Sequence, residues 1–87
     1  MLLLGRCKLA RVNGNSMKPT LHDGDWVIYC PCCSPRELNG RVVVCRHPYE
    51  SRLLIKRVSR VTPENELFLL GDLPEESTDS RMFGAVA

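Results

Sequence analysis

The sequence predicts a small, mostly β domain of antiparallel strands, and three observations lead to this fold class. The chain has 87 residues, which is enough for one hydrophobic core and too few for two. Its apolar segments are short, rich in valine and separated by turn residues. No long window shows the i, i+3, i+4, i+7 spacing of an amphipathic helix. We therefore expect one domain over residues 1–87, with one short helical turn near its C-terminus.

The strand candidates follow one another along the whole chain. They are Leu9–Val12, Trp26–Cys30, Arg41–Arg46, Leu53–Val61 and Leu67–Leu70. Glycine, proline, asparagine and aspartate separate them, because these residues fix a bend or tolerate a positive φ. The pair Asn39-Gly40 directly precedes the third candidate and predicts a hairpin turn that leads into a buried strand.

Composition and charge exclude several classes of protein. Twelve Lys and Arg residues against ten Asp and Glu leave a net charge of +2, too small for a protein that wraps nucleic acid. The longest apolar runs are far shorter than the roughly 20 residues that span a bilayer. The first apolar residues precede Arg6 and Lys8, which reverses the order of a signal peptide. We therefore expect no nucleic-acid partner, no integral membrane anchor and a cytoplasmic location.

The five cysteines, at positions 7, 30, 32, 33 and 45, are an odd number without a secretory context. In a reducing cytosol we expect free thiols rather than a disulfide framework. The run Cys30-Pro31-Cys32-Cys33 suggests a metal site, but soft-metal sites normally take four ligands at separated spacings. We therefore expect no metal and no cofactor, and a metal-carrying chaperone is the weakest alternative function.

A serine on a glycine-containing turn is the first candidate for chemistry. Gly14 permits a close backbone approach just before Ser16, and Pro19 favours an extended conformation at Lys18. Such a turn exposes a potential nucleophile. Most serines beside glycine are only turn residues, however, so this segment alone favours a structural role.

The strand candidate Leu53–Val61 contains two adjacent cations. Side chains alternate along a strand, so Lys56 and Arg57 lie on opposite faces and one of them faces inward. Lysine is the better inward candidate, because burial lowers its pKa and can leave a neutral amine, whereas arginine stays charged. A neutral amine beside a serine hydroxyl can accept its proton. An edge strand with outward charges that discourage aggregation is the alternative.

A polar segment near the C-terminus is dense in small hydrogen-bonding residues. Asp79 and Arg81 are close enough to form an ion pair, and the Ser77 hydroxyl is available to orient a neighbour. Taken alone, the segment is equally typical of a polar loop.

Together, these segments resemble the signal peptidase I superfamily over about Val12 to Val86. The motifs, in order, are Ser16-Met17-x-Pro19-Thr20-Leu21, Gly24-Asp25-x-Val27, Lys56-Arg57-Val58, and Gly71-Asp72 followed by Ser77-x-Asp79-Ser80-Arg81. The resemblance implies the antiparallel β fold of the signal peptidase catalytic core, without its large β insertion. It implies Ser16 as nucleophile and Lys56 as general base. It further implies that Ser77 positions the lysine and that Asp79 and Arg81 form a supporting ion pair.

Within that superfamily, the chain resembles the maturation proteases of nickel-containing superoxide dismutase. Only 14 residues separate Lys56 from Gly71, where ordinary signal peptidases commonly carry a large insertion, and the Ser77–Gly84 ending also resembles this branch. The resemblance implies a serine endopeptidase that removes an N-terminal leader from the dismutase precursor. That precursor would bind as an extended peptide at an exposed strand edge. The candidates for the apolar wall of its binding site are Met17, Leu21, Trp26 and Leu54.

Departures from the superfamily pattern leave some assignments open. Gly14 stands where some signal peptidases place a serine that helps to hold the oxyanion, so the second donor would be another group, with Asn15 as a candidate. The self-cleaving repressors of the SOS response are an alternative, since they share a Ser-Met near a Gly-Asp turn and a distant lysine. They do not explain the Ser77–Gly84 segment. A catalytically silent binding or dimerisation module on the same scaffold is a further alternative.

Overall fold

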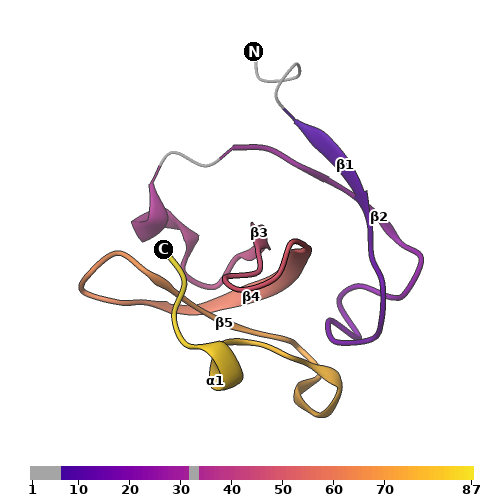
Figure 1. Cartoon of the computed structure of the whole chain (residues 1–87). Coiled ribbons are helices and arrows are strands. Elements are labelled where there is room, and N and C mark those ends of the chain that lie inside the picture. Colours follow the sequence, from indigo (N-terminus) through magenta and orange to yellow (C-terminus); the bar gives the residue numbers. More distant parts are fainter. Residues whose placement is uncertain (1–6, 32–33) are drawn as a thin grey trace.

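The computed structural model describes residues 7–31 and 34–87, which form two small antiparallel sheets with little helix (Figure 1). The strands are β1 (Lys8–Arg11), β2 (Trp26–Tyr29), β3 (Val42–Arg46), β4 (Leu53–Val61) and β5 (Leu67–Leu70). The helical elements are the 3-10 helices η2 (Pro35–Leu38) and η3 (Pro74–Glu76) and the one-turn helix α1 (Ser80–Phe83). The predicted mostly β fold class is therefore confirmed. No helix in the described ranges is long and apolar enough to cross a membrane.

The first sheet consists of β1 and β2, joined by a long loop. The two strands pair from Lys8 opposite Tyr29 to Arg11 opposite Trp26. Backbone hydrogen bonds close the base of the loop, because the Val12 N–H donates to the Asp25 carbonyl over 2.7 Å. The loop that follows β1 therefore starts from a fixed and buried position, since Val12 is only 4% exposed.

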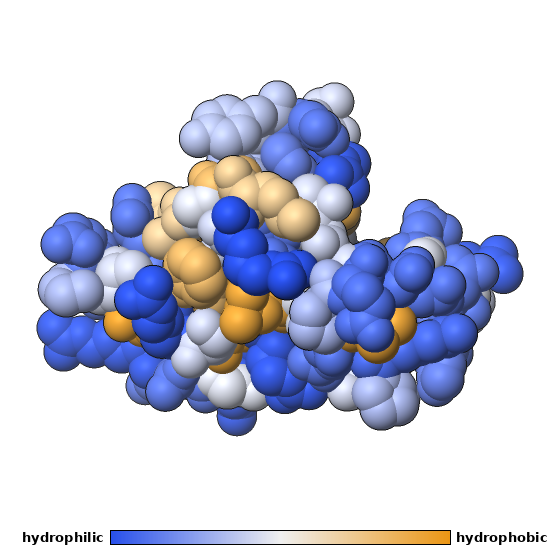
Figure 2. Space-filling model, turned by 90° about the horizontal axis from the view of Figure 1, so that it is seen from below, coloured by the Kyte–Doolittle hydropathy of each residue, from blue (hydrophilic) through white to orange (hydrophobic). Residues whose placement is uncertain are grey.

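The second sheet has the strand order β3, β4, β5 and carries the core. Val58, Leu67 and Leu69 are buried at its centre, and half-buried apolar residues surround them. This core is shallow, as expected for a short chain. Figure 2 shows apolar side chains reaching the surface in the middle of one face, with hydrophilic residues around them.

Strand positions agree closely with the sequence prediction, but the predicted hairpin at Asn39-Gly40 is wrong. The bounds of β4 and β5 are as predicted, and the other strands differ by a residue at one or both ends. Gly40 follows η2 instead of a strand, and its N–H donates to the Val58 carbonyl over 2.8 Å. The Val58 N–H donates in turn to the Arg41 carbonyl. These residues therefore begin the pairing of β3 with β4, and β3 is an edge strand with exposed ends, not a buried one.

The prediction of free thiols is wrong for Cys7 and Cys30, which form a disulfide. Lys8 and Tyr29 face each other in the β1–β2 pair, so the next facing positions bring these two cysteines together, with their Cα atoms 4.1 Å apart. The register of β1 with β2 determines this pairing, and the number of cysteines in the sequence gives no information about that register. Cys45 is free and half-buried, and residues 32 and 33 lie outside the described part of the chain.

Candidate active site

Ser16 lies in the loop between β1 and β2, and backbone contacts hold this loop on two sides. The Gly14 N–H donates to Oδ1 of Asp23 over 2.7 Å, and the φ of +88° at Gly14 is one that favours glycine. From the other side, the Leu73 N–H donates to the Ser16 carbonyl over 2.8 Å. Met17 is only 1% exposed and anchors the next position in the interior. The Ser16 backbone is thus fixed while its side chain stays partly exposed.

Lys56 reaches Ser16 from the inward face of β4. Strand alternation places Leu54, Lys56 and Val58 on this face, and Lys56 is only 5% exposed. The lysine therefore faces inward, as the sequence predicted, and Arg57 faces the other side of the sheet. Nζ of Lys56 lies 2.7 Å from Oγ of Ser16, in hydrogen-bond contact, although 40 positions separate the two residues.

Burial controls the protonation of the Lys56 amine. Removal from water disfavours the charged form and lowers the pKa of Lys56 from its ordinary value of 10.5. The negative charge of Asp79 opposes this shift, the positive charge of Arg52 adds to it, and Cys45 opposes it. Because the pKa of Lys56 remains lowered, more of the amine is neutral than in an exposed lysine at the same pH.

Asp79 is the centre of the hydrogen-bond network behind the Ser16 and Lys56 pair. Its side chain is fully buried and accepts hydrogen bonds from the Ser77 hydroxyl at 2.8 Å, the Gly71 N–H at 3.0 Å and Nε of Arg81 at 2.8 Å. Burial raises the pKa of Asp79, but the hydrogen bonds from Arg81, Gly71 and Ser77 outweigh it and lower this pKa to about 2. The carboxylate is therefore charged at neutral pH.

The Ser77 hydroxyl bonds to Asp79 and not to the lysine. Within residues 7–31 and 34–87, no hydrogen bond joins Ser77 to Lys56, whose bonded partner is Ser16. Ser77 is 6% exposed and packs against Gly71, so it lies close to the Ser16 segment.

Gly71 permits the close packing behind Ser16. A Cβ atom at this position would overlap the Ser77 side chain and would lie 2.7 Å from the Ser16 carbonyl oxygen. Sequence reasoning placed Gly71 in a motif but assigned it no role. The available signal was its position between the strand candidate Leu67–Leu70 and the polar C-terminal segment.

A second network, which sequence reasoning missed, joins Arg57, Asp72 and Thr20. Nε and Nη2 of Arg57 donate to the two carboxylate oxygens of Asp72, each over 2.9 Å, and Nη1 donates to the Gly40 carbonyl. The Thr20 hydroxyl donates to Oδ2 of Asp72 over 2.5 Å. The Ser16 loop, β4 and the segment after β5 are thus tied together. The bidentate geometry is specific to arginine.

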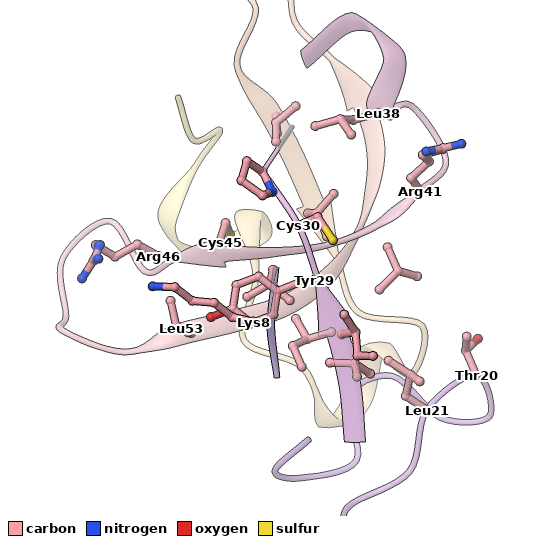
Figure 3. A pocket seen from close by; sticks show the side chains of 18 residues that line it. Lys8, Thr20, Leu21, Tyr29, Cys30, Leu38, Arg41, Cys45, Arg46 and Leu53 are labelled. Carbon is pink, nitrogen blue, oxygen red and sulfur yellow. The ribbon is translucent and has the colours of Figure 1, made fainter. Parts of the chain in front are cut away.

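A groove of about 900 Å³ lies between β2 and β3 (Figure 3). Its lining includes Val43, which faces Lys56 in the sheet, and Thr20 and Leu21 from the Ser16 loop. Both strands are edges of the sheets that residues 7–31 and 34–87 form, so each presents backbone groups that no other described strand pairs. Ser16 and Lys56 themselves are not among the lining residues, so the groove approaches the pair only through neighbours such as Leu21 and Val43. Its β3 wall is long enough to contact several residues of an extended peptide.

Comparison with protein families decides the class of this chain. A family model described as Peptidase S24-like matches residues 3–78, most of the 87 positions. The chain belongs to the peptidase S24-like family. The prediction of a serine peptidase is confirmed at this level. Comparison with curated proteins and with solved structures gave no match.

This S24-like peptidase distributes the residues expected in the substrate wall over three environments. Leu21 lines the groove. Met17 and Leu54 are buried and do not line it, at 1% and 4% exposure. Trp26 is 62% exposed and lies under the Arg11 guanidinium, 5.8 Å from the ring centre.

The remaining expected residues of the S24-like peptidase are Asn15, which adjoins Ser16, and the pair Asp79 and Arg81. Asn15 precedes Ser16 in the loop, is partly exposed, and accepts a hydrogen bond from the Lys18 N–H at its carbonyl. Asp79 and Arg81 form the expected ion pair at 2.8 Å. In the described part of the chain, no group of three or more His, Cys, Asp or Glu side chains could hold a metal ion.

Proposed function

We propose that this S24-like peptidase is an endopeptidase in which Ser16 is the nucleophile and Lys56 is the general base. The observation that carries the proposal is the 2.7 Å contact between Oγ of Ser16 and Nζ of a lysine that is 5% exposed. A general base must lie within hydrogen-bond reach of the proton it removes and must be unprotonated at the working pH. The contact meets the first condition, and the lowered pKa of Lys56 favours the second.

The reaction is acyl transfer through two tetrahedral intermediates. The neutral Lys56 amine accepts the Ser16 proton while Oγ attacks the carbonyl carbon of the scissile peptide bond. The C–N bond then breaks, the Lys56 ammonium protonates the leaving amine, and an ester joins the substrate acyl group to Ser16. Water, deprotonated by the same amine, hydrolyses this ester and restores the free hydroxyl.

The backbone of Ser16 supplies the first donor to the developing oxyanion. No backbone hydrogen bond among the described residues uses the Ser16 N–H, whereas the neighbouring Ser16 carbonyl is held by Leu73. The N–H therefore has a fixed direction and a free proton. Asn15 is our candidate for the second donor.

Asp79, Arg81 and Ser77 are positioning residues in this proposal. The Arg81 side chain holds Asp79, and Asp79 holds the Ser77 hydroxyl and the Gly71 N–H, which pack against the Ser16 backbone. These contacts keep Oγ in reach of the amine.

The substrate is a precursor protein whose segment binds as an extended strand in the groove between β2 and β3. Two sheet edges face this groove, so a peptide there can pair with backbone groups on either wall. The sequence resemblance makes the precursor of nickel-containing superoxide dismutase the first substrate to test, with removal of its N-terminal leader in the cytoplasm. Self-cleavage of the SOS-repressor type is the second candidate, because the S24-like match fits it as well.

The test uses purified wild-type chain and four variants, incubated with a nickel dismutase precursor, with the new N-terminus identified by intact mass. We expect cleavage by the wild type and by Ser59→Ala, a control for an exposed serine on β4. Ser16→Ala and Lys56→Ala should be inactive. Lys56→Arg should also be inactive, because arginine keeps the charge but cannot become neutral.

Three outcomes separate the alternatives. Cleavage by folded Ser16→Ala at the wild-type rate would exclude the proposed nucleophile. Cleavage of the chain itself, with the precursor left intact, would favour the repressor-type alternative. If a folded wild-type chain cleaves neither, the catalytic proposal is wrong and a binding module remains.

A further inference from the structure

The charges along the groove between β2 and β3 are all of one sign. Its walls are mainly apolar, and its charged lining residues are Lys8, Arg41 and Arg46. None of the described residues that line the groove is acidic. An occupant with apolar and acidic side chains would match this surface in both properties.

The three cations lie at the two ends of the groove. Arg41 directly precedes β3 and Arg46 is its last residue, so about 16 Å of extended strand separates them. Figure 3 shows Arg41 at one end, and Lys8 and Arg46 reaching toward the other. The apolar part of the groove lies between the two positive ends.

None of these cations forms an ion pair with a carboxylate of the described residues. The ion pairs among residues 7–31 and 34–87 use Arg52, Arg57 and Arg81. Glu50, the acidic residue nearest to Arg46 in the sequence, is paired with Arg52. The positive potential of the groove is therefore not cancelled locally, and apolar walls of low polarisability strengthen it.

We propose that the groove selects extended substrate segments that carry an acidic residue at one or both ends of a short apolar stretch. This inference rests on the proposed function, which places the substrate in this groove. Pairing with the edges of β2 and β3 uses only backbone groups and has no sequence preference, so side-chain selection must come from the lining. The cations supply it.

The position of the active pair predicts where the acidic residues lie relative to the cleaved bond. Val43 pairs with Lys56 in the sheet, so in this proposal the cleaved bond of the bound segment lies beside the middle of β3. Arg46 is three positions beyond Val43, and Arg41 is two positions before it. Acidic side chains about three residues from the cleaved bond on one side, or about two on the other, would reach these cations.

The test measures peptide binding to the Ser16→Ala variant, in which no cleavage can obscure affinity. The probes are three fluorescein-labelled peptides with the same centre, Ala-Val-Ala-Val, flanked on both sides by Glu, Gln or Lys. The flanking residues are then five positions apart, as Arg41 and Arg46 are. Fluorescence anisotropy gives the dissociation constants at low and high salt.

We expect the Glu peptide to bind about tenfold more tightly than the Lys peptide at low salt, and salt should reduce the difference. Lys8→Gln, Arg41→Gln and Arg46→Gln should each weaken Glu-peptide binding about two- to fivefold and leave Gln-peptide binding unchanged. Arg36→Gln is the matched control, because it removes the same charge from an exposed position outside the groove. Thermal unfolding of each variant checks the fold.

Equal affinities for the Glu and Lys peptides would overturn the inference. A preference for the Glu peptide that persists when Lys8, Arg41 and Arg46 are all replaced by glutamine would also overturn it. The same holds if Arg36→Gln weakens Glu-peptide binding as much as the groove variants do. The result is independent of the proposed catalysis. If the protein cleaves a precursor but shows no preference for acidic peptides, only this inference is wrong. If a folded wild-type chain binds acidic peptides but cleaves nothing, only the proposed function is wrong.

Discussion

Replacing Asp79 by asparagine should destabilise the protein in a pH-dependent way. Asparagine has nearly the same shape, and its one oxygen can still accept hydrogen bonds from Ser77 and Gly71, which share Oδ2. Its NH2 group then replaces Oδ1, the acceptor for Arg81, so the substitution removes the negative charge and this acceptor together. In the folded protein the pKa of Asp79 falls from 3.8 to about 2. One pKa unit corresponds to about 1.4 kcal/mol, so the charged carboxylate stabilises the fold by about 2 kcal/mol at neutral pH.

The sign of this effect fixes the pH range in which it operates. Because the pKa of Asp79 is lower in the folded state, the stabilisation is fully present above the ordinary value of 3.8 and disappears as the pH falls through about 2. Asp79→Asn should therefore be about 2 kcal/mol less stable than the wild type at neutral pH. The difference should shrink as the pH falls below about 4, and most of it should be lost by pH 2.

Urea unfolding at a series of pH values measures this difference directly. The midpoint of the variant should lie about 1 to 2 M urea below that of the wild type at neutral pH, given the slope expected for a small domain. Glu75→Gln, an exposed carboxylate in the neighbouring η3, is the control and should change the midpoint little. Equal midpoints for wild type and Asp79→Asn at neutral pH, or a difference that is constant down to pH 2, would refute the reasoning.

Three further predictions concern the base, the packing glycine and the disulfide. The rate of peptide cleavage should rise with pH and level off above an apparent pKa lower than 10.5, because only the neutral Lys56 amine accepts a proton; a pH-independent rate with chemistry limiting would contradict this. Gly71→Ala should lower cleavage at least about tenfold, since its Cβ would lie 2.7 Å from the Ser16 carbonyl oxygen, and unchanged kinetics would contradict the packing argument. Reduction of the disulfide with dithiothreitol should lower the free energy of unfolding by about 3 kcal/mol, the stabilisation expected from closing a loop of this length. Cys7→Ser should be insensitive to dithiothreitol, and an equal loss of stability in both proteins would contradict this prediction.

The sequence predicted those parts of the fold that depend on local pattern. The alternation in Leu53–Val61 defined both the bounds of β4 and its inward face, because a buried strand face tolerates a lysine only where its charge can be lost or compensated. The juxtaposition of Ser16 with Lys56 was expected only from the family resemblance that the ordered motifs carry. No local pattern connects two residues that are 40 positions apart.

The features that sequence reasoning missed all depend on register or on the packing of distant segments. Cys7 and Cys30 meet because Lys8 faces Tyr29, and Asn39-Gly40 begins a pairing with β4 that its turn-like composition does not reveal. Arg57 contacts Asp72 and the Gly40 carbonyl from a strand face that alternation identified as outward. Alternation assigned no partner to this position, whereas the segment after β5 supplies one in Asp72.

That segment, residues 71–79, joins the stability of the fold to the geometry of the active pair. Two of its four carboxylates pair with arginines, Asp72 with Arg57 and Asp79 with Arg81. The same segment holds the Ser16 carbonyl through the Leu73 N–H. In a domain this small, a core of a few buried side chains cannot by itself fix a loop to within a few tenths of an ångström. Ion pairs and backbone hydrogen bonds from one segment perform this task, so the contact between serine and lysine should be lost whenever that segment detaches, before the sheets themselves unfold.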